Sequence, residues 1–169
     1  MKPAKKNALV VVDCQNDFCE GGSLAIPGAV SVVLSVNELR KNNSFDHVFL
    51  TCDWHPEDHV SFAVNHPGGK PYGTVVLPNG KVEEVWPVHC VQNQKGAEFH
   101  KDLVREPTDI IIKKGFLKDH NGYSGFGACI EKTGLVEYLQ SKGVEKVFVC
   151  GLALDFCVKN TAIDGAKNG

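Results

Sequence analysis

The stretch Ala8-Leu-Val-Val-Val12-Asp13 decides the fold. Its apolar residues, most of them β-branched, follow one another without polar interruption, which is typical of a strand buried on both faces of a sheet. The run stops at the carboxylate of Asp13, as expected where the carboxyl end of a strand opens into a site. We therefore predict a parallel central strand over residues 8–12.

Further apolar runs share this pattern, and each leads into a polar or glycine-containing segment. They occupy residues 47–51, 109–112 and 146–150. Segments with helical spacing of apolar residues alternate with them, at residues 29–41, 130–142 and 156–167. This alternation predicts an α/β fold, a three-layer α/β/α sandwich with a mainly parallel central sheet and a ligand crevice at the carboxyl ends of the strands.

The segment at about 56–100 is irregular and rich in proline. Within it, Pro78-Asn79-Gly80 reads as the turn of a small hairpin between residues 74–77 and 81–82. We interpret the segment as an insertion that passes over the site, so that residues 1–169 form a single domain. Gly169 follows the last helix where another strand is expected, and the domain is therefore expected to lack a C-terminal strand and helix.

Composition narrows the class of function. Hydrophobic residues make up 43% of the 169-residue chain and its formal net charge is −2, so no basic surface is expected for nucleic acid or anionic lipid. No apolar segment approaches the length of a membrane span or of a signal-peptide core. The 7 cysteines lack CxxC spacing, which favours a reducing, cytoplasmic compartment over a disulfide framework. A small-molecule partner fits this composition better than a macromolecule.

Cys157 is a candidate nucleophile. It follows a strand and a glycine-containing turn at the start of a helix, where the helix N-terminus favours the thiolate. Backbone N–H groups of the same turn could form an oxyanion hole. Asp13 could accept the thiol proton if a cation, such as Lys114, held it in place. The alternative is a buried helix cysteine, a strand-end carboxylate and a solvated lysine.

A metal site is the second candidate. Asp53 and His55 alternate along the chain after the second strand, and His89 arrives from the irregular segment. One oxygen and two imidazole nitrogens could form a face of three ligands with open positions for water or substrate. His59 follows His55 by four residues. Loop histidines are, however, more often surface residues than ligands.

Aromatic residues accompany these polar groups. Phe18 follows Asp13, Trp86 precedes His89, and Tyr123 lies in a glycine-rich loop. Rings of this kind would hold a flat aromatic substrate by stacking, although packing in the core or at a rim would explain them equally well.

Five motifs, in order along the chain, resemble those of nicotinamidases in the isochorismatase-like hydrolase superfamily. They are Val-Val-Asp13-Cys-Gln-Asn-Asp17-Phe18, Gly-Gly-Ser23-Leu-Ala-Ile-Pro27-Gly28, Asp53-Trp-His55-Pro-Glu-Asp-His59-Val-Ser-Phe62, Trp86-Pro-Val-His89-Cys90-Val and Gly151-Leu-Ala-Leu-Asp155-Phe-Cys157-Val. The resemblance runs from about Asn7 to the end of the chain. It implies the isochorismatase-like hydrolase fold and hydrolysis of nicotinamide to nicotinate and ammonia through a cysteine thioester, in NAD salvage.

The resemblance also implies roles for single residues. Its catalytic triad falls on Asp13, Lys114 and Cys157, and Lys114 is selected over Lys113 because the family lysine precedes a glycine. The implied oxyanion hole is the backbone of Ala153 and Cys157, beside a cis peptide. The resemblance also implies one divalent metal ion on Asp53, His55 and His89, most typically Zn²⁺ with Fe²⁺ or Mn²⁺ as alternatives. His59 is implied either to lie beside these ligands or to serve as a fourth. The implied aromatic substrate pocket consists of Phe18, Trp86 and Tyr123.

In the implied mechanism, the pyridine nitrogen of nicotinamide binds the metal and the carboxamide meets Cys157. A homo-oligomer is compatible with the family. Two rival hypotheses remain: another amidohydrolase of the superfamily that acts on a different substrate, and a non-catalytic metal-binding or redox-thiol module. Loss of activity on chelation would separate metal-dependent from metal-free members, and thiol labelling without ammonia release would favour the non-catalytic module.

Overall fold

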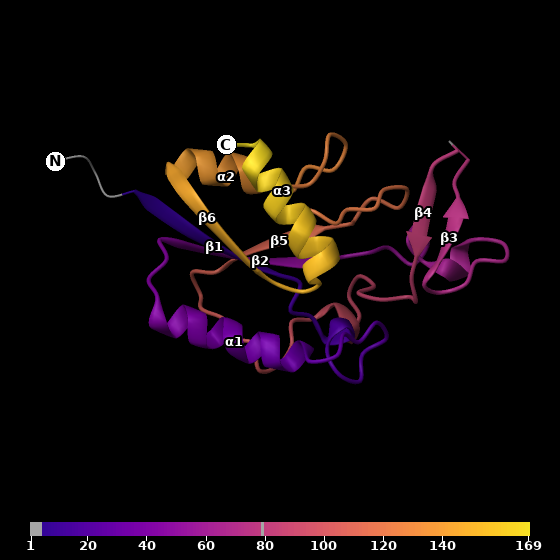
Figure 1. Cartoon of the computed structure of the whole chain (residues 1–169), viewed down its shortest axis with the longest axis horizontal. Helices are drawn as coiled ribbons and strands as arrows, with labels where there is room; N and C mark the ends of the chain where they lie inside the picture. The colour runs from indigo at the N-terminus through magenta and orange to yellow at the C-terminus, as the bar shows by residue number, and fades with distance from the viewer. Residues whose placement is uncertain (1–4, 79) are drawn as a thin grey trace.

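The central sheet is fully parallel in the computed structural model, which describes residues 5–78 and 80–169 (Figure 1). Its strands lie in the order β5-β2-β1-β6, with bounds β1 Lys6–Val12, β2 His47–Asp53, β5 Ile110–Lys114 and β6 Val144–Gly151. All four predicted strands are therefore confirmed. The parallel register, in which Val12 pairs with Thr51 on one side and Gly151 on the other, brings the carboxyl ends of the strands to one edge.

Helices cover both faces of the sheet, which confirms the predicted three layers (Figure 1). α1 (Ala29–Asn42) packs on one face against Leu9 and Val11 of β1. α2 (Leu135–Lys142) and α3 (Lys159–Lys167) lie on the other face, where α2 contacts Val10. Successive residues of β1 thus point into two separate apolar cores, and this is why its sequence is apolar throughout.

α2 begins later than predicted. The periodicity predicted a helix over residues 130–142, but the helix starts at Leu135. Gly134, at its N-cap, has a left-handed φ of 82°, and Glu131 is buried with its carboxylate bonded to backbone N–H groups of another loop. The tertiary contact of Glu131 therefore overrides the local helical pattern. The predicted helix over 156–167 is confirmed, as a π-helical turn (Leu154–Val158) that continues into α3.

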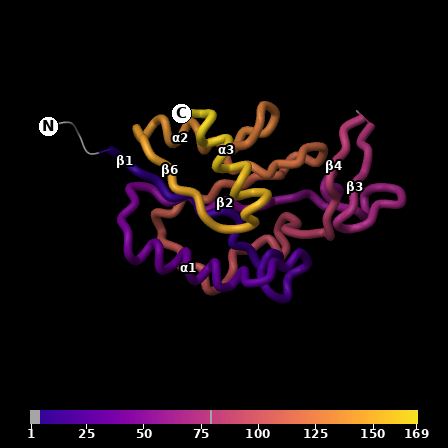
Figure 2. The backbone as a smooth tube through the Cα atoms, in the orientation of Figure 1, coloured from indigo at the N-terminus to yellow at the C-terminus, as the bar shows by residue number. Residues whose placement is uncertain are grey.

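The irregular segment contains an antiparallel hairpin of β3 (Gly73–Val76) and β4 (Val82–Val85), as predicted. Asn79, in the centre of the predicted turn, lies outside the described residues. The backbone trace shows this hairpin at the opposite end of the molecule from α2 (Figure 2). Three short 3₁₀ turns, Asn16–Phe18, Ala63–Asn65 and Lys95–Ala97, complete the secondary structure of the described residues.

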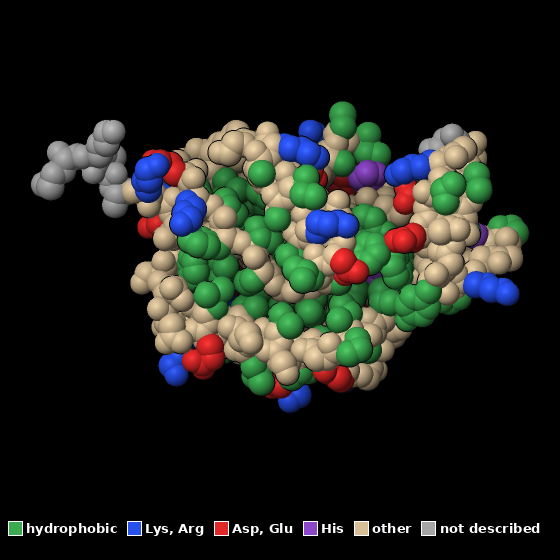
Figure 3. All heavy atoms as spheres, viewed as in Figure 1, with side chains coloured by type: hydrophobic (Ala, Val, Ile, Leu, Met, Phe, Trp, Pro, Cys, Tyr) green, Lys and Arg blue, Asp and Glu red, His purple; other side chains and the backbone are tan. Residues whose placement is uncertain are grey.

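β6 is an edge strand, and apolar side chains gather on the surface beside it (Figure 3). Val147 and Val149 of β6 line a groove there together with Leu139 of α2. None of the helices described here combines the length and apolar character needed to cross a membrane.

Candidate active site

The residues predicted for chemistry meet at the carboxyl edge of the sheet. Asp13 directly follows β1, Asp53 and Lys114 end β2 and β5, and Cys157 lies in the π-helical turn after β6. Asp53 and Lys114 are register partners in the parallel β2–β5 pair. Sheet geometry alone therefore places these side chains, which are distant in sequence, within contact of one another.

Lys114 stands at the centre of the site. Its fully buried ammonium Nζ lies 2.9 Å from Asp13 Oδ2, 2.5 Å from Asp53 Oδ1, and 3.3 Å from Cys157 Sγ. It also donates a hydrogen bond of 3.2 Å to the carbonyl oxygen of Gly122. Burial by itself would lower the pKa of Lys114, but the two carboxylates raise it well above its usual value. Lys114 is therefore a permanent cation between two acids.

Asp13 has one oxygen fixed and one available. Thr51 Oγ1 donates a 2.7 Å hydrogen bond to Oδ1. Oδ2 is the one buried side-chain oxygen or nitrogen that lacks a hydrogen bond in the described part of the chain, although the Lys114 ammonium is close. The backbone of Asp13 is held at φ 49°, a left-handed conformation that is uncommon outside glycine and often occurs at functional sites. Oδ2 thus faces the site, where the Lys114 ammonium is its ion-pair partner.

The thiol of Cys157 lies within reach of this acceptor. Its Sγ and carboxylate oxygens of Asp13 and Asp53 all lie within 4.8 Å of one another. Burial raises the pKa of the Cys157 thiol well above its usual value, and the Lys114 ammonium opposes that shift only in part. Burial also raises the pKa of Asp13, against the influence of Lys114. The arrangement is that of a neutral thiol beside a carboxylate of increased basicity, which suits proton transfer from sulfur to Asp13.

The turn that carries Cys157 begins at a cis peptide between Leu152 and Ala153. The N–H of Ala153 forms no hydrogen bond to another residue in the described ranges. Both Ala153 and Cys157 line the pocket described below. A free N–H beside the nucleophile is what an oxyanion hole requires, so the predicted assignment to this backbone is compatible with the geometry.

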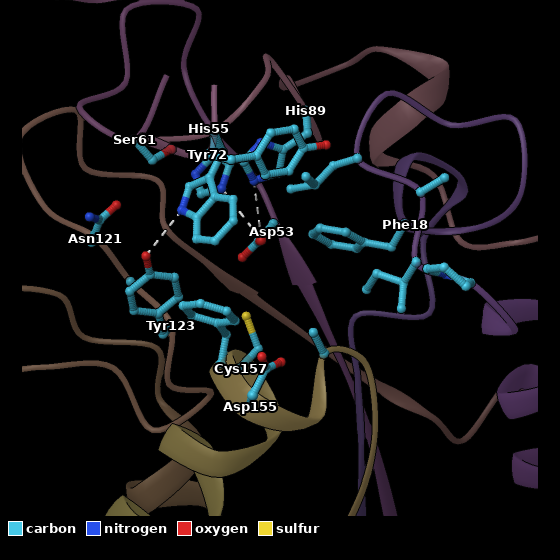
Figure 4. A pocket seen from close by; sticks show the side chains of 18 residues that line it. Phe18, Asp53, His55, Ser61, Tyr72, His89, Asn121, Tyr123, Asp155 and Cys157 are labelled. Atoms are coloured by element: carbon cyan, nitrogen blue, oxygen red, sulfur yellow. Dashed lines mark hydrogen bonds and ion pairs between the residues drawn. The ribbon is translucent and has the colours of Figure 1, made fainter. Parts of the chain in front are cut away.

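Asp53, His55 and His89 also converge, and their donor atoms lie within 4.8 Å of one another. Asp53 Oδ2 is 3.4 Å from His55 Nε2 and 4.0 Å from His89 Nε2 (Figure 4). The other ring nitrogens are both occupied, because Nδ1 of His55 meets the Gly115 carbonyl at 2.6 Å and Nδ1 of His89 meets the Pro87 carbonyl at 2.7 Å.

These carbonyl contacts decide which nitrogen could bind a metal. A carbonyl accepts only from a protonated Nδ1, so in the neutral form of each ring the Nε2 lone pair is directed at the shared space. Burial and the neighbouring His55 lower the pKa of His89 to about 4, which keeps that ring neutral. Burial would raise the pKa of Asp53, but the opposing influences, chiefly the Lys114 ammonium, hold that pKa below its usual range. One carboxylate and two imidazoles fit a divalent metal ion.

His59 is not part of this donor group. Its Nδ1 lies 2.7 Å from Ser61 Oγ and its Nε2 lies 3.0 Å from the carbonyl oxygen of His120, so both nitrogens have partners. Its ring stacks on that of His55, with centroids 4.1 Å apart. The geometry therefore favours the alternative in which His59 lies beside the ligands and supports His55.

A pocket of about 280 Å³ opens above these groups. Phe18, Trp86 and Tyr123, the predicted aromatic residues, all line it, and Cys157 and Asp53 reach it from the sheet edge (Figure 4). Trp86 Nε1 donates to the Tyr123 hydroxyl at 3.2 Å, which fixes two of the rings relative to each other. The volume and the apolar lining suit a single aromatic ring with a small polar substituent.

Sequence reasoning missed several residues at the site. Tyr72 and Phe156 also line the pocket, and Phe156 contacts Trp86 edge-on with ring centroids 4.9 Å apart. Gln15 is fully buried, and its amide exchanges hydrogen bonds of 2.8 Å with both the N–H and the carbonyl oxygen of Asp53. The available signal was a polar amide three residues after the buried strand.

Comparison with known proteins supports this description. An isochorismatase domain model matches residues 7–169. A nicotinamidase of Acinetobacter baylyi is 44% identical over 171 residues, which cover 100% of this chain and 78% of that relative. The yeast nicotinamidase bound to the inhibitor nicotinaldehyde has a TM-score of 0.89 and 34% identity, over 96% of this chain and 82% of that one. A zinc complex of Pyrococcus horikoshii pyrazinamidase has a TM-score of 0.78 and 37% identity, over 97% and 80% of the two chains.

Proposed function

This chain belongs to the isochorismatase domain family, and from that premise we infer that it is a nicotinamidase, which hydrolyses nicotinamide to nicotinate and ammonia. One observation carries this function: Cys157, which meets Asp13 and Lys114, and the donor group of Asp53 and two histidines open into the same aromatic pocket. We propose further that the enzyme acts in the cytoplasm, in the salvage of nicotinamide for NAD.

The reaction requires a thiolate, and Asp13 generates it. As Sγ of Cys157 attacks the carboxamide carbon, the thiol proton passes to Oδ2, the oxygen without a hydrogen bond. Lys114 balances the charge on Asp13 before this transfer and stays protonated after it. The N–H groups of Ala153 and Cys157 would stabilise the tetrahedral oxyanion.

The same carboxyl completes the turnover. Asp13 returns its proton to the amide nitrogen, the C–N bond breaks, and ammonia leaves a thioester on Cys157. Asp13 then accepts a proton from water as the water attacks the thioester carbon. Nicotinate leaves, and the proton returns to Sγ. Every proton in this sequence moves through one buried acid.

The metal site sets the orientation of the substrate. Asp53, His55 and His89 would hold a divalent ion, for which we propose zinc, with Fe²⁺ and Mn²⁺ as the alternatives. A bound ion would supply a Lewis-acidic point for the pyridine nitrogen, while Phe18, Trp86 and Tyr123 hold the ring. Because the Cys157 thiol and the donor group line the same pocket, a ring that binds the ion there would present its carboxamide to Cys157 (Figure 4).

Ammonia release from nicotinamide tests this function. The metal-loaded protein should release ammonia, whereas Cys157→Ala should lower the rate by at least about 10³-fold because the nucleophile is lost. Cys129→Ala is the matched control, since Cys129 is an exposed cysteine outside the pocket, and it should keep the full rate. Undiminished release by the Cys157 variant, or no release by the metal-loaded wild type, would overturn the proposal.

A further inference from the structure

Glu131 is a buried carboxylate that the mechanism above does not use. It is 0% exposed and has no ion-pair partner among the described residues. Its oxygens instead accept hydrogen bonds from the backbone N–H groups of Gly115 at 2.9 Å, Phe116 at 3.0 Å and Leu117 at 3.4 Å. A buried charge bound only by peptide dipoles is costly to maintain, and a functional reason for it should be sought.

The peptide between Gly115 and Phe116 links this carboxylate to the metal site. Its N–H end, on Phe116, donates to Glu131 Oε2 at 3.0 Å. Its carbonyl end, on Gly115, accepts from Nδ1 of His55 at 2.6 Å. Negative charge at the N–H end of a peptide polarises the group and strengthens its carbonyl as an acceptor. Carboxylate, peptide and imidazole therefore form one chain of hydrogen bonds that ends at a candidate metal ligand.

We propose that Glu131 is a positioning residue for the metal site, which acts on His55 through the Gly115–Phe116 peptide. It fixes the Nδ1–H form of the ring, and it makes Nε2 a stronger metal donor. A carboxylate bonded directly to a ligand histidine has these effects in metalloproteins, and here one peptide group lies between the two. This inference rests on the metal site of the proposed function.

Two glycines allow the close contacts that link Glu131, the Gly115–Phe116 peptide and His55. Gly115 has φ +61°, and a Cβ there would lie 2.4 Å from Cε1 of His55, so only glycine allows the ring to approach this carbonyl. A Cβ on Gly122 would lie 2.4 Å from Glu131 Oε1. The carbonyl of Gly122 also accepts from Lys114 Nζ, so a residue packed against Glu131 contacts the central cation of the site.

Metal affinity, measured on the full chain, tests the proposal. We compare Glu131→Gln with Thr133→Val, a control in the same segment that loses a 2.8 Å hydrogen bond to the Gly125 carbonyl but does not touch residues 115–117. The Zn²⁺ dissociation constant is measured by competition with a chromophoric chelator, and the visible spectrum of the Co²⁺ form reports the ligand field. Glu131→Gln should weaken Zn²⁺ binding by about 10-fold or more and alter the Co²⁺ spectrum. Thr133→Val should change neither.

Equal Zn²⁺ affinity and Co²⁺ spectra in Glu131→Gln and the wild type, or equal losses in both variants, would overturn the inference. If the glutamine variant does not fold, Glu131→Asp replaces it. Its shorter side chain withdraws the carboxylate from the Phe116 N–H and should also weaken Zn²⁺ binding, so unchanged affinity there would overturn the inference. Failure of the proposed function looks different, because the wild type itself would then bind no zinc or release no ammonia.

Discussion

At the scale of single residues, the site depends on one cation shared by two acids. Lys114 neutralises Asp13, the proposed base, and Asp53, a proposed metal ligand, and both contacts are buried. Removal of one partner from a buried ion pair leaves an uncompensated charge, which costs more than the pair contributed. Loss of the Lys114 charge should therefore lower both the free energy of unfolding and the rate of the reaction.

Replacement of Lys114 by methionine should affect both stability and activity. In metal-free protein, where no ion compensates Asp53, Lys114→Met should lower the free energy of unfolding by about 3–5 kcal/mol, measured by urea denaturation. Ammonia release by the metal-loaded variant should be lost. The neighbouring Lys113→Met is the control, because Lys113 is exposed and its contact with the Trp54 ring contributes about 0.5–1 kcal/mol. Equal stability of Lys114→Met and the wild type would contradict the shared-cation description.

At the scale of elements, each helix is held by the apolar face that it turns to the sheet. Leu135 of α2 is fully buried in the core that contains Val10 and Phe49, and Cys157 belongs to the same core. Leu34 of α1, a residue of the same type in a helix, is 51% exposed. Packing at α2 thus supports the turn that carries the nucleophile.

Truncation of these two leucines should have very different effects. Leu135→Ala should lower the free energy of unfolding by about 2–5 kcal/mol, because it removes buried apolar contacts and leaves a cavity. Leu34→Ala should change it by no more than about 0.5 kcal/mol. Thermal or urea unfolding followed by circular dichroism measures both values. Similar losses for the two variants would show that the core does not lie where the structure places it.

At the scale of the whole molecule, the metal site joins segments from distant parts of the chain. His55 follows β2, and the segment that carries His89 pairs with it through backbone hydrogen bonds from His55 to the Cys90 carbonyl at 3.0 Å and from Gln92 to the His55 carbonyl at 2.9 Å. The donors are thus brought together by the fold itself. Ligand binding to such a preformed site stabilises the folded state by mass action.

Removal of the metal should therefore lower the melting temperature. At a free zinc concentration about 100 times the dissociation constant, the stabilisation is about 2.7 kcal/mol, which corresponds to about 5–10 °C for a chain of this size. Cys157→Ala should show the same difference between zinc-loaded and chelated samples, since the thiol is not a proposed ligand. Equal melting temperatures of the zinc-loaded and the chelated wild type would contradict the metal site.

The apolar runs and their spacing along the chain were enough to predict the layers of the fold and the strand ends that carry the site. Burial of β1 on two faces leaves a continuous apolar run, and periodicity marks α1, so both could be predicted locally. The tertiary structure decided which side chains meet. It paired Lys114 with both acids, satisfied both nitrogens of His59, and diverted Glu131 from a helical pattern to the backbone of a distant loop. The physical reason is that the pattern of apolar residues along a segment shows which of its faces is buried. Hydrogen-bond partners, in contrast, come from segments far apart in the sequence and meet only in the folded chain.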